Sequence, residues 1–409
     1  MALTRRGFLS GCAAAGLGAA AYATFPTSWK SLSDFGAVAD GTYHPATGRM
    51  AGTDNTDAIN AALTTGNPVV IPPGLYYYAG SLHTDVEGSG LIGSGSRLSY
   101  LITDRSRDRH ISVVAGTTNT QWINFGMIGP FDTEGDGLNR AITIGVDSTL
   151  TDLAGSHWDA AGTWIDEIEV FGYRVGLHVA HADNVEFGSI GVFEAGDSKA
   201  EPGSYGVTCS GSNLRGRSLR AVNTTTRARH ALYYTGSAND CFVELVEAKG
   251  FDLAAVQNRF REGGGQRNGF GFGKFIDCNT NEGAEPVNSL RGVVNFGSAG
   301  DIAVAGAGGA RIGDYYTIDC GGFPGPSLKY VPHSRCGTVT VFGHSGDFTA
   351  QRYGAHIDHS NDVKLPLLVF VGCFSGAGLN RAEFDPLVVD DSVDCYGGGV
   401  RCIPAADSP

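Results

Sequence analysis

Two segments of the sequence, GVTCSGSNL (residues 206–214) and ALYYTGSAND (residues 231–240), can be written one beneath the other. Each begins with a small residue, continues as a strand-like run and ends in a turn of Ser, Ala, Asn, Asp and Gly. Three further segments fit the same pattern: GLHVAHADNV from Gly176, GVVNFGSAGDI from Gly292 and GAHIDHSNDV from Gly354. The first three begin 30 and 25 residues apart, and the later gaps of 61 and 62 residues fit two to three repeats each. One strand and turn per repeat of about this length is typical of a solenoid, whose coils stack because none can bury its own apolar face.

The alternation of side chains along a strand assigns the two faces of each repeat. The inward set is predicted to be Leu177, Val179, Val207, Cys209, Leu232, Tyr234, Val293, Asn295, Ala355 and Ile357. The outward set is predicted to be His178, Thr208, Tyr233, Val294 and His356. Arg229 shares the outward parity of Tyr233, whereas His230 lies at a corner where either direction is open. A register error of one residue would reverse each assignment.

The composition favours an all-β chain and excludes one class of partner. Glycine makes up 61 of the 409 residues, about twice the usual share, without a collagen period, which indicates many tight turns. The formal charge is −13, and no cluster of Lys and Arg forms a basic face. We therefore expect no nucleic-acid partner.

The segments DFGAVADG (34–41), TDNTDAINAAL (53–63) and VVIPPGLY (69–76) carry a resemblance to a known family. Residues 33–78 are similar to the N-terminal segment of the pectate-lyase-superfamily right-handed parallel β-helices, a group of polysaccharide lyases, polygalacturonase-like glycosidases and phage tailspikes. The segment TYHPATGRMAG (42–52) is extra relative to the family pattern. The resemblance implies an all-β fold, a single right-handed parallel β-helix over residues 24–409 with an N-terminal capping helix. It also implies an extracellular polysaccharide as partner, and a monomer or a homotrimer.

The N-terminus predicts export. Paired arginines, Arg5 and Arg6, precede an Ala- and Gly-rich apolar stretch that ends in Ala21-Tyr22-Ala23, a small-x-small cleavage pattern. This resembles a twin-arginine signal over residues 1–23, so we expect a secreted or periplasmic protein with no membrane span, because the stretch is short. Eight cysteines follow Cys12, and an even number in an exported protein permits disulfides. Cys395 and Cys402 are close enough in sequence to pair across a small loop.

One stretch, RARHALYY (227–234), carries the residue types that β-elimination on a uronate needs. That reaction requires a cation for the substrate carboxylate, a base for the acidic proton and an acid for the leaving oxygen. The predicted catalytic residues are His230, Arg229 and Tyr233. The predicted substrate-binding residues are Arg227, Asn223, Lys249 and Arg220. The alternative is structural: the arginines form ion pairs with glutamates of the next strand, the histidine is a corner residue and the tyrosines stack.

Glycoside hydrolysis is the second reaction open to this fold, and it needs two facing carboxylates. The candidate carboxylates are Glu244, Glu247, Asp277, Asp314 and Asp319. Glu244 and Glu247 would point to opposite faces of a strand unless a bend intervenes. The polygalacturonase-like pattern is not met, because NTD occurs only at residues 55–57, inside the predicted capping helix. A non-catalytic glycan-binding or surface protein is the third alternative.

The sequence gives no specific indication of a metal or cofactor. Ca²⁺ can be held by turn carboxylates such as Asp183, Asp301 and Asp362, but no established calcium-loop spacing occurs. His356, Asp358 and His359 lie close in sequence, yet they do not share one strand face. We therefore predict no cofactor and no metal site, and expect these residues to form polar turns.

Overall fold

The computed structural model describes residues 29–44, 47–131, 139–146, 157–196, 203–235, 237–260, 266–279, 292–298, 308–320, 323–342, 355–371, 388–390 and 392–403. The chain divides into two compact units, one of residues 1–204 and 224–226, the other of residues 205–223 and 227–409. The predicted signal, residues 1–23, lies outside the described residues and stays a prediction.

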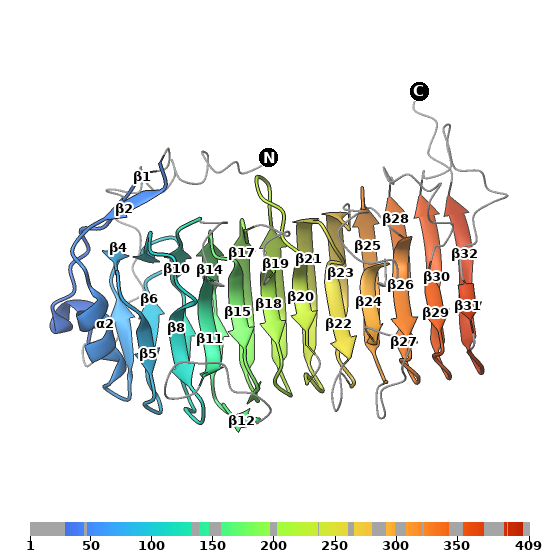
Figure 1. Cartoon of the computed structure of the whole chain (residues 1–409), viewed down its shortest axis with the longest axis horizontal. Coiled ribbons are helices and arrows are strands. Elements are labelled where there is room, and N and C mark those ends of the chain that lie inside the picture. The colour runs from blue at the N-terminus through green and yellow to red at the C-terminus, as the bar shows by residue number, and fades with distance from the viewer. Residues whose placement is uncertain are drawn as a thin grey trace. The chain divides into compact units, whose positions relative to one another are not determined.

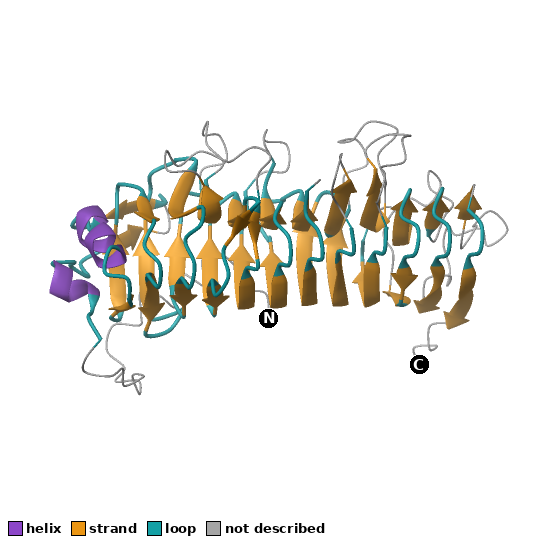
Figure 2. Cartoon of the chain, turned by 90° about the horizontal axis from the view of Figure 1, so that it is seen from below, coloured by secondary structure: helices purple, strands orange, loops and turns teal. Residues whose placement is uncertain are grey.

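The first unit begins with the predicted cap. Helices η1 (Leu32–Phe35) and α2 (Thr56–Leu63) lie over the end of its strand stacks (Figure 2), and α2 buries Ile59, Ala62 and Leu63 beneath it. Asn55 is buried at the start of α2, where its side-chain oxygen accepts the Val38 N–H at 2.7 Å. The extra segment of residues 42–52 is an antiparallel hairpin of β1 (Thr42–His44) and β2 (Arg49–Ala51).

The coils of the first unit have three strands each, which form three parallel stacks (Figure 1). The first stack contains β3 (Pro68–Ile71), β6 (Gly90–Gly93), β9 (Gln121–Ile123) and β13 (Trp164–Asp166). The second contains β4 (Gly74–Tyr77), β7 (Ser99–Ile102), β10 (Gly126–Ile128) and β14 (Ile168–Phe171), and β17 (Glu186–Phe193) pairs with the last strand of both. The third contains β5 (Leu82–Thr84), β8 (Arg109–Val114), β11 (Arg140–Val146) and β15 (Val175–Val179). A short parallel pair, β12 (Trp158–Asp159) and β16 (Ala182–Asp183), lies beside them.

Stacked side chains fill the interior of the first unit. Leu82, Ile111, Ile142 and Leu177 stand in register on successive strands, and each is at most 1% exposed. A polar group is also enclosed: the Tyr78 hydroxyl lies 3.2 Å from Nδ1 of His110. Burial, with a smaller effect of Arg107, lowers the pKa of His110 to about 3, so this imidazole is neutral in the folded chain at neutral pH.

The second unit has two strand stacks (Figure 1). The short-strand stack contains β18 (Tyr205–Cys209), β20 (His230–Tyr234), β22 (Val256–Phe260), β24 (Gly292–Ser298), β26 (Phe323–Lys329), β29 (His356–Asp358) and β31 (Val388–Asp390). The long-strand stack contains β19 (Arg215–Val222), β21 (Phe242–Phe251), β23 (Gly269–Cys278), β25 (Arg311–Ile318), β27 (Arg335–Cys336), β28 (Thr338–Phe342), β30 (Lys364–Val371) and β32 (Tyr396–Ile403). The predicted fold class, a right-handed parallel β-helix with an N-terminal capping helix, is confirmed.

Most of the predicted register is confirmed. Val207 pairs with Leu232 and Thr208 with Tyr233, as the aligned repeats require. One repeat was wrong by one residue: Val294, not Val293, stands over Val256 in the inward column, and the predicted inward residue Asn295 stands over Gln257 in the outward column. Gly292 therefore is not equivalent to the small residues that open the other repeats, and a one-residue shift reverses every side chain of the strand.

The long strands bend where they pass from one side of the coil to the next. In β21 the pairing with β23 skips Glu244, because Val243 pairs with Phe270 and Leu245 with Phe272. Glycines occupy this bend in the following coils: a Cβ on Gly313 would lie 1.7 Å from the carbonyl oxygen of Gly271. At Gly313 the backbone of the neighbouring coil is thus too close for any other residue.

The bend gives a stability prediction. Gly313→Ala should lower the free energy of unfolding by about 3 kcal/mol, because the added methyl group meets backbone that cannot move aside. Gly397→Ala is the control, since the nearest atom lies 3.9 Å away and the cost is only that of its φ of 78°, about 1 kcal/mol. Denaturant unfolding measures both, and an equal or smaller loss at Gly313 would contradict close coil contact.

The described cysteines do not form the expected disulfide. Cys395 is free and lies just before β32, while Cys402 lies near its other end. Seven residues of strand span about 23 Å, whereas a disulfide needs Cα atoms within about 7 Å. The expectation of a Cys395–Cys402 pair was wrong because the segment between them is a strand and not a loop.

Thiol reactivity should separate the described cysteines. Cys209, Cys241, Cys278, Cys320 and Cys336 are buried, and burial raises the pKa of Cys278 above its usual range and that of Cys336 to about 12. Because the thiolate is the reactive form, we expect iodoacetamide to alkylate the half-buried Cys395 of the folded protein faster than all five.

Peptide mass spectrometry after timed alkylation measures this, with a denatured sample as the control in which all six react. Native labelling of Cys336 at the rate of Cys395 would contradict the burial.

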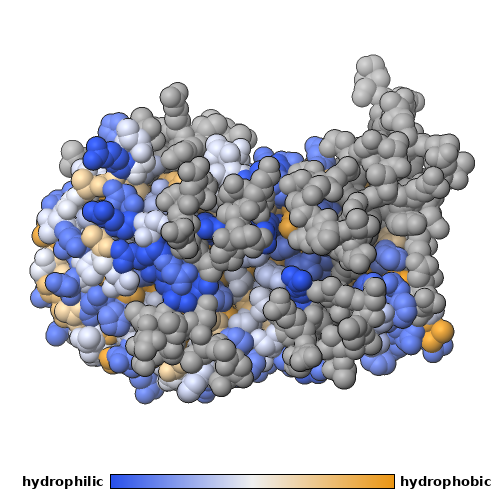
Figure 3. Space-filling view, viewed as in Figure 1, coloured by the Kyte–Doolittle hydropathy of each residue, from blue (hydrophilic) through white to orange (hydrophobic). Residues whose placement is uncertain are grey.

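The outer surface is mostly polar. Figure 3 shows one face, on which the described residues are largely hydrophilic, with small apolar areas between them. Within the described ranges, the chain contains no helix with the length and hydropathy of a membrane span.

Candidate active site

A row of polar side chains follows the outward side of the short-strand stack in the second unit. In register order the row contains Thr208, Tyr233, Gln257, Asn295, Ser327 and His356. A parallel row two residues further on brings Arg259, Lys329 and Asp358 onto the same side. Thr208, Asn295 and Ser327 of the first row are buried, whereas Tyr233, Gln257 and His356 are half-buried. Strand stacking therefore aligns one polar position per coil, but only part of the row reaches the surface.

Three rings meet at the β18–β20 end of this row. Tyr205 begins β18, His230 begins β20 directly above it, and their rings stack at 5.9 Å between centroids. Tyr233 approaches both, with its ring 5.2 Å from that of Tyr205 and 5.3 Å from that of His230. His230 is only 7% exposed, whereas both tyrosines are half-buried. The imidazole thus contacts two phenol rings that also contact each other and that are partly exposed.

The hydrogen bond of His230 fixes its tautomer. Its Nδ1 lies 2.7 Å from the carbonyl oxygen of Ala254, which can only accept, so Nδ1 carries the proton and donates. Nε2 then holds a lone pair, and none of the described residues hydrogen-bonds to it. Burial lowers the pKa of His230 to about 4, the bond to Ala254 opposes that shift, and the positive charges of Arg229 and Arg259 add to it. The ring is neutral at physiological pH, with its lone pair on Nε2.

Two arginines supply positive charge near this ring. Arg229 precedes β20 and is half-buried, and Arg259 lies on the outward side of β22 and is exposed. Both contribute to the lowered pKa of His230, which places their charges within electrostatic reach of it. An anionic substrate group would be attracted here against the net charge of −13.

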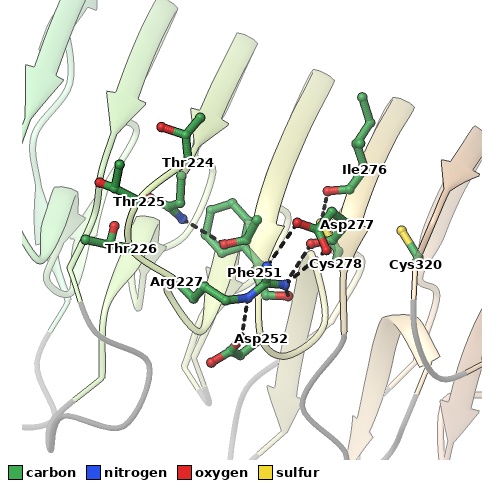
Figure 4. Close-up of polar contacts among 12 residues, drawn as sticks. Thr224, Thr225, Thr226, Arg227, Phe251, Asp252, Ile276, Asp277, Cys278 and Cys320 are labelled. Atoms are coloured by element: carbon green, nitrogen blue, oxygen red, sulfur yellow. Dashed lines mark hydrogen bonds and ion pairs between the residues drawn. The ribbon is translucent and has the colours of Figure 1, made fainter. Parts of the chain in front are cut away.

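Arg227 lies in a separate cluster. Figure 4 shows its guanidinium between Asp252 and Asp277, with Nε 2.5 Å from Asp252 Oδ1 and one terminal nitrogen 2.9 Å from Asp277 Oδ2. A further bond runs to the backbone carbonyl of Asp277 at 3.1 Å. Burial tends to lower the pKa of Arg227, but its bonds and charge contacts to both aspartates raise it overall. Arg227 and Asp277, predicted as substrate-binding residue and alternative carboxylate, thus contact each other.

The remaining predicted residues belong to the long-strand stack and its turns. Glu247 on β21 lies 3.7 Å from Arg220 Nε on β19 and 3.7 Å from Lys274 Nζ on β23. Lys249 follows two residues later on the same side of β21, and Glu244 is exposed at the bend of that strand. Asn223 is buried and donates its amide to the Gly250 carbonyl at 3.2 Å.

The predicted set therefore divides into groups. His230, Arg229 and Tyr233 come together, whereas Arg227 and Asp277 form an ion pair and Arg220, Glu247 and Lys249 lie on the other stack. The residues missed were Tyr205, Gln257, Asn295 and Arg259. Tyr205 precedes Gly206 as His230 precedes Ala231, so the aligned repeats contained the signal that these two rings stack.

No metal site was found in the part of the chain that the structure describes: no three His, Cys, Asp or Glu side chains gather closely enough there to hold an ion. His359 and Asp358 form a local pair at a turn, with Lys329 Nζ 3.7 Å from the other oxygen of Asp358.

The neutral state of His230 gives a pH prediction. The unfolded chain protonates this histidine near pH 6.5, whereas the folded chain does so only near pH 4. Protonation therefore favours the unfolded chain, and the free energy of unfolding decreases as the pH falls from 6.5 to 4. Within this pH range, His230 should lower the free energy of unfolding by about 1.4 kcal/mol for each unit by which the pH falls.

Denaturant unfolding of His230→Gln should show a shallower acid dependence between pH 6.5 and 4 than the unsubstituted chain. His110, in the first unit, retains its own contribution of the same sign. His333→Gln, at an exposed turn, serves as the matched control. An unchanged slope in His230→Gln would show that this imidazole is not buried as a neutral ring.

Comparison with known proteins gives structural likenesses only. No protein-family model matches the chain, and no curated protein matches its sequence. The catalytic unit of a GH87 α-1,3-glucanase from Streptomyces thermodiastaticus is 14% identical, with 92% of this chain and 70% of that chain covered and a TM-score of 0.36. The A-module of mannuronan C-5 epimerase AlgE6 from Azotobacter vinelandii is 16% identical, with 90% and 99% covered and a TM-score of 0.44. Tailspike protein 2 of bacteriophage CBA120 is 13% identical, with 92% and 47% covered and a TM-score of 0.43.

Proposed function

We propose that the chain is an enzyme that cleaves a uronate-containing polysaccharide by β-elimination, with the reaction centred on His230. The observation that carries this proposal is the state of that imidazole. It is neutral, its Nδ1 donates to the Ala254 carbonyl, and it contacts two tyrosine rings with arginine charge nearby. A positioned neutral base, a phenol and a cation are the three parts that the reaction needs.

The roles follow from the chemistry of each group. Arg229 pairs with the uronate carboxylate, which stabilises the carbanion-like charge that develops when the neighbouring C–H proton leaves. His230 Nε2 takes the proton from C5, a double bond forms between C4 and C5, and the bond from C4 to the glycosidic oxygen breaks. The Tyr233 hydroxyl donates the proton that this oxygen gains, and the phenol regains one from solvent. The products are an unsaturated uronate end and a new hydroxyl end, without an oxidant or cofactor.

Glycoside hydrolysis has less support from the same residues. It requires two carboxyl groups facing a common substrate, one of them as acid. Asp277 contacts Arg227, and Glu247 contacts Arg220 and Lys274, so these carboxylates already serve ion pairs within the fold. The substrate of a uronate lyase lies outside the cell, in keeping with the predicted twin-arginine signal.

The test is a screen of uronate polymers, namely polygalacturonate, alginate and hyaluronate, for the ultraviolet absorbance of an unsaturated uronate product. With the polymer that responds, His230→Ala should lower kcat by about 100-fold or more, since proton abstraction loses its base. Arg229→Ala should lower kcat/KM, because substrate binding and transition-state charge are both affected.

His333→Ala is the matched control, a histidine of the same unit at an exposed turn paired with Asp362. Thermal unfolding of each variant separates lost chemistry from lost fold. Product that raises reducing ends without the absorbance would assign a hydrolase, and unchanged activity in His230→Ala would refute the assigned base.

A further inference from the structure

A second surface of the second unit carries exposed aromatic side chains. Phe272 on β23, Tyr316 on β25 and Phe342 on β28 stand on three successive strands of the long-strand stack, each two residues further along than the last in the register. Their ring centroids are 5.9 and 6.2 Å apart, and Phe272 and Phe342 are 41% and 39% exposed. Together they line a shallow groove of about 770 Å³. An outward strand position ordinarily favours a polar residue, so three aromatic ones in contact indicate a bound partner.

The groove also offers hydrogen bonds. Asp314 lies in it and accepts the Thr338 backbone N–H at 2.7 Å through one oxygen only. The hydroxyls of Tyr316 and Thr340 line the same groove, and within the described ranges neither hydroxyl has a hydrogen-bond partner. The surface therefore alternates apolar ring faces with free donors and acceptors, which suits a ligand with both C–H faces and hydroxyl groups.

Charge narrows the class of ligand. Asp314 is the one ionisable carboxylate among the described residues that line the groove, and no Lys or Arg lines it with them. Lys274, in register beside Tyr316, has its Nζ 3.7 Å from Glu247. An anionic chain would meet an uncompensated negative charge here on a molecule that is already acidic, whereas a neutral one would not.

We propose that this groove binds a neutral glycan segment, with sugar rings packed on Phe272, Tyr316 and Phe342 and sugar hydroxyls bound by Asp314 and Thr340. The site lies on the long-strand stack, whereas the His230 cluster belongs to the short-strand stack, so the inference does not rest on the proposed β-elimination. Diagonal placement of the rings across three strands gives the ligand a direction oblique to the strands.

The chain without its predicted signal, residues 24–409, is titrated by isothermal calorimetry with cellohexaose, xylohexaose, laminarihexaose and maltohexaose. At least one neutral hexasaccharide should bind, and Tyr316→Ala and Phe342→Ala should each weaken that binding about tenfold. Tyr316→Phe should retain most of the affinity, because the ring face is kept. Tyr396→Ala, an exposed tyrosine on β32, is the matched control and should bind normally.

Three results would overturn the proposal: no binding of any neutral hexasaccharide, equal binding by the double variant Tyr316→Ala/Phe342→Ala, or tighter binding of oligogalacturonate than of neutral sugars in the same groove. Sedimentation velocity of the same samples tests for self-association. If the unsubstituted chain forms an oligomer and the double variant does not, the groove is a contact between copies of the chain and not a glycan site. Because the binding is measured without turnover, its outcome is independent of whether the chain is a lyase.

Discussion

The stacking of one coil on the next is the constraint on which the described structure depends. Parallel pairing places each side chain directly over its counterpart in the coil below. Each residue must therefore pack against the equivalent residues of the neighbouring coils, as well as fit its own strand. Leu82, Ile111, Ile142 and Leu177 form such a column in the interior of the first unit. The same rule acts on the backbone at the bend of the long strands, where Gly313 stands against Gly271 with no room for a Cβ.

This constraint also explains the state of His230. The ring begins its strand as Tyr205 begins the strand below, so pairing alone brings imidazole and phenol face to face. The next coil supplies the Ala254 carbonyl that accepts the hydrogen bond from Nδ1–H. A neutral tautomer, with its lone pair on Nε2, results from coil geometry and burial and requires no charged partner to orient it.

Much of the fold could be predicted from the sequence because the repeat is local. The pairing of Val207 with Leu232, and of Thr208 with Tyr233, follows from two segments that begin with a small residue and end in the same turn. The repeat at Gly292 was misplaced by one residue, since nothing within a segment marks its register when the coil before it has a different length. The sequence pattern showed where the extra segment lies, but it did not predict that this segment forms the β1–β2 hairpin.

The candidate site was harder to predict from the sequence, because residues that are close along the chain can lie in different clusters once the chain forms a coil. Arg227 and Arg229 are two residues apart, yet Arg227 lies at a turn between Asp252 and Asp277, whereas Arg229 stands beside the His230 ring. Glu244 and Glu247 were expected on opposite faces, but the bend at Glu244 leaves that residue exposed as well. The partners of Arg227 lie 25 and 50 residues away, on the next two coils, and only the register brings them together.

The same argument accounts for the aromatic groove, which no motif marks. Phe272, Tyr316 and Phe342 are separated by long stretches of sequence and occur in segments with no common pattern. They meet because β23, β25 and β28 are adjacent and because each ring is shifted by two residues, the period of one strand face. On such a fold, function is encoded in columns and diagonals across coils. The polar row beside His230 and the aromatic line on the other stack are two sets of that kind. Arginine charge lies near the first, whereas no Lys or Arg is among the described residues that line the second.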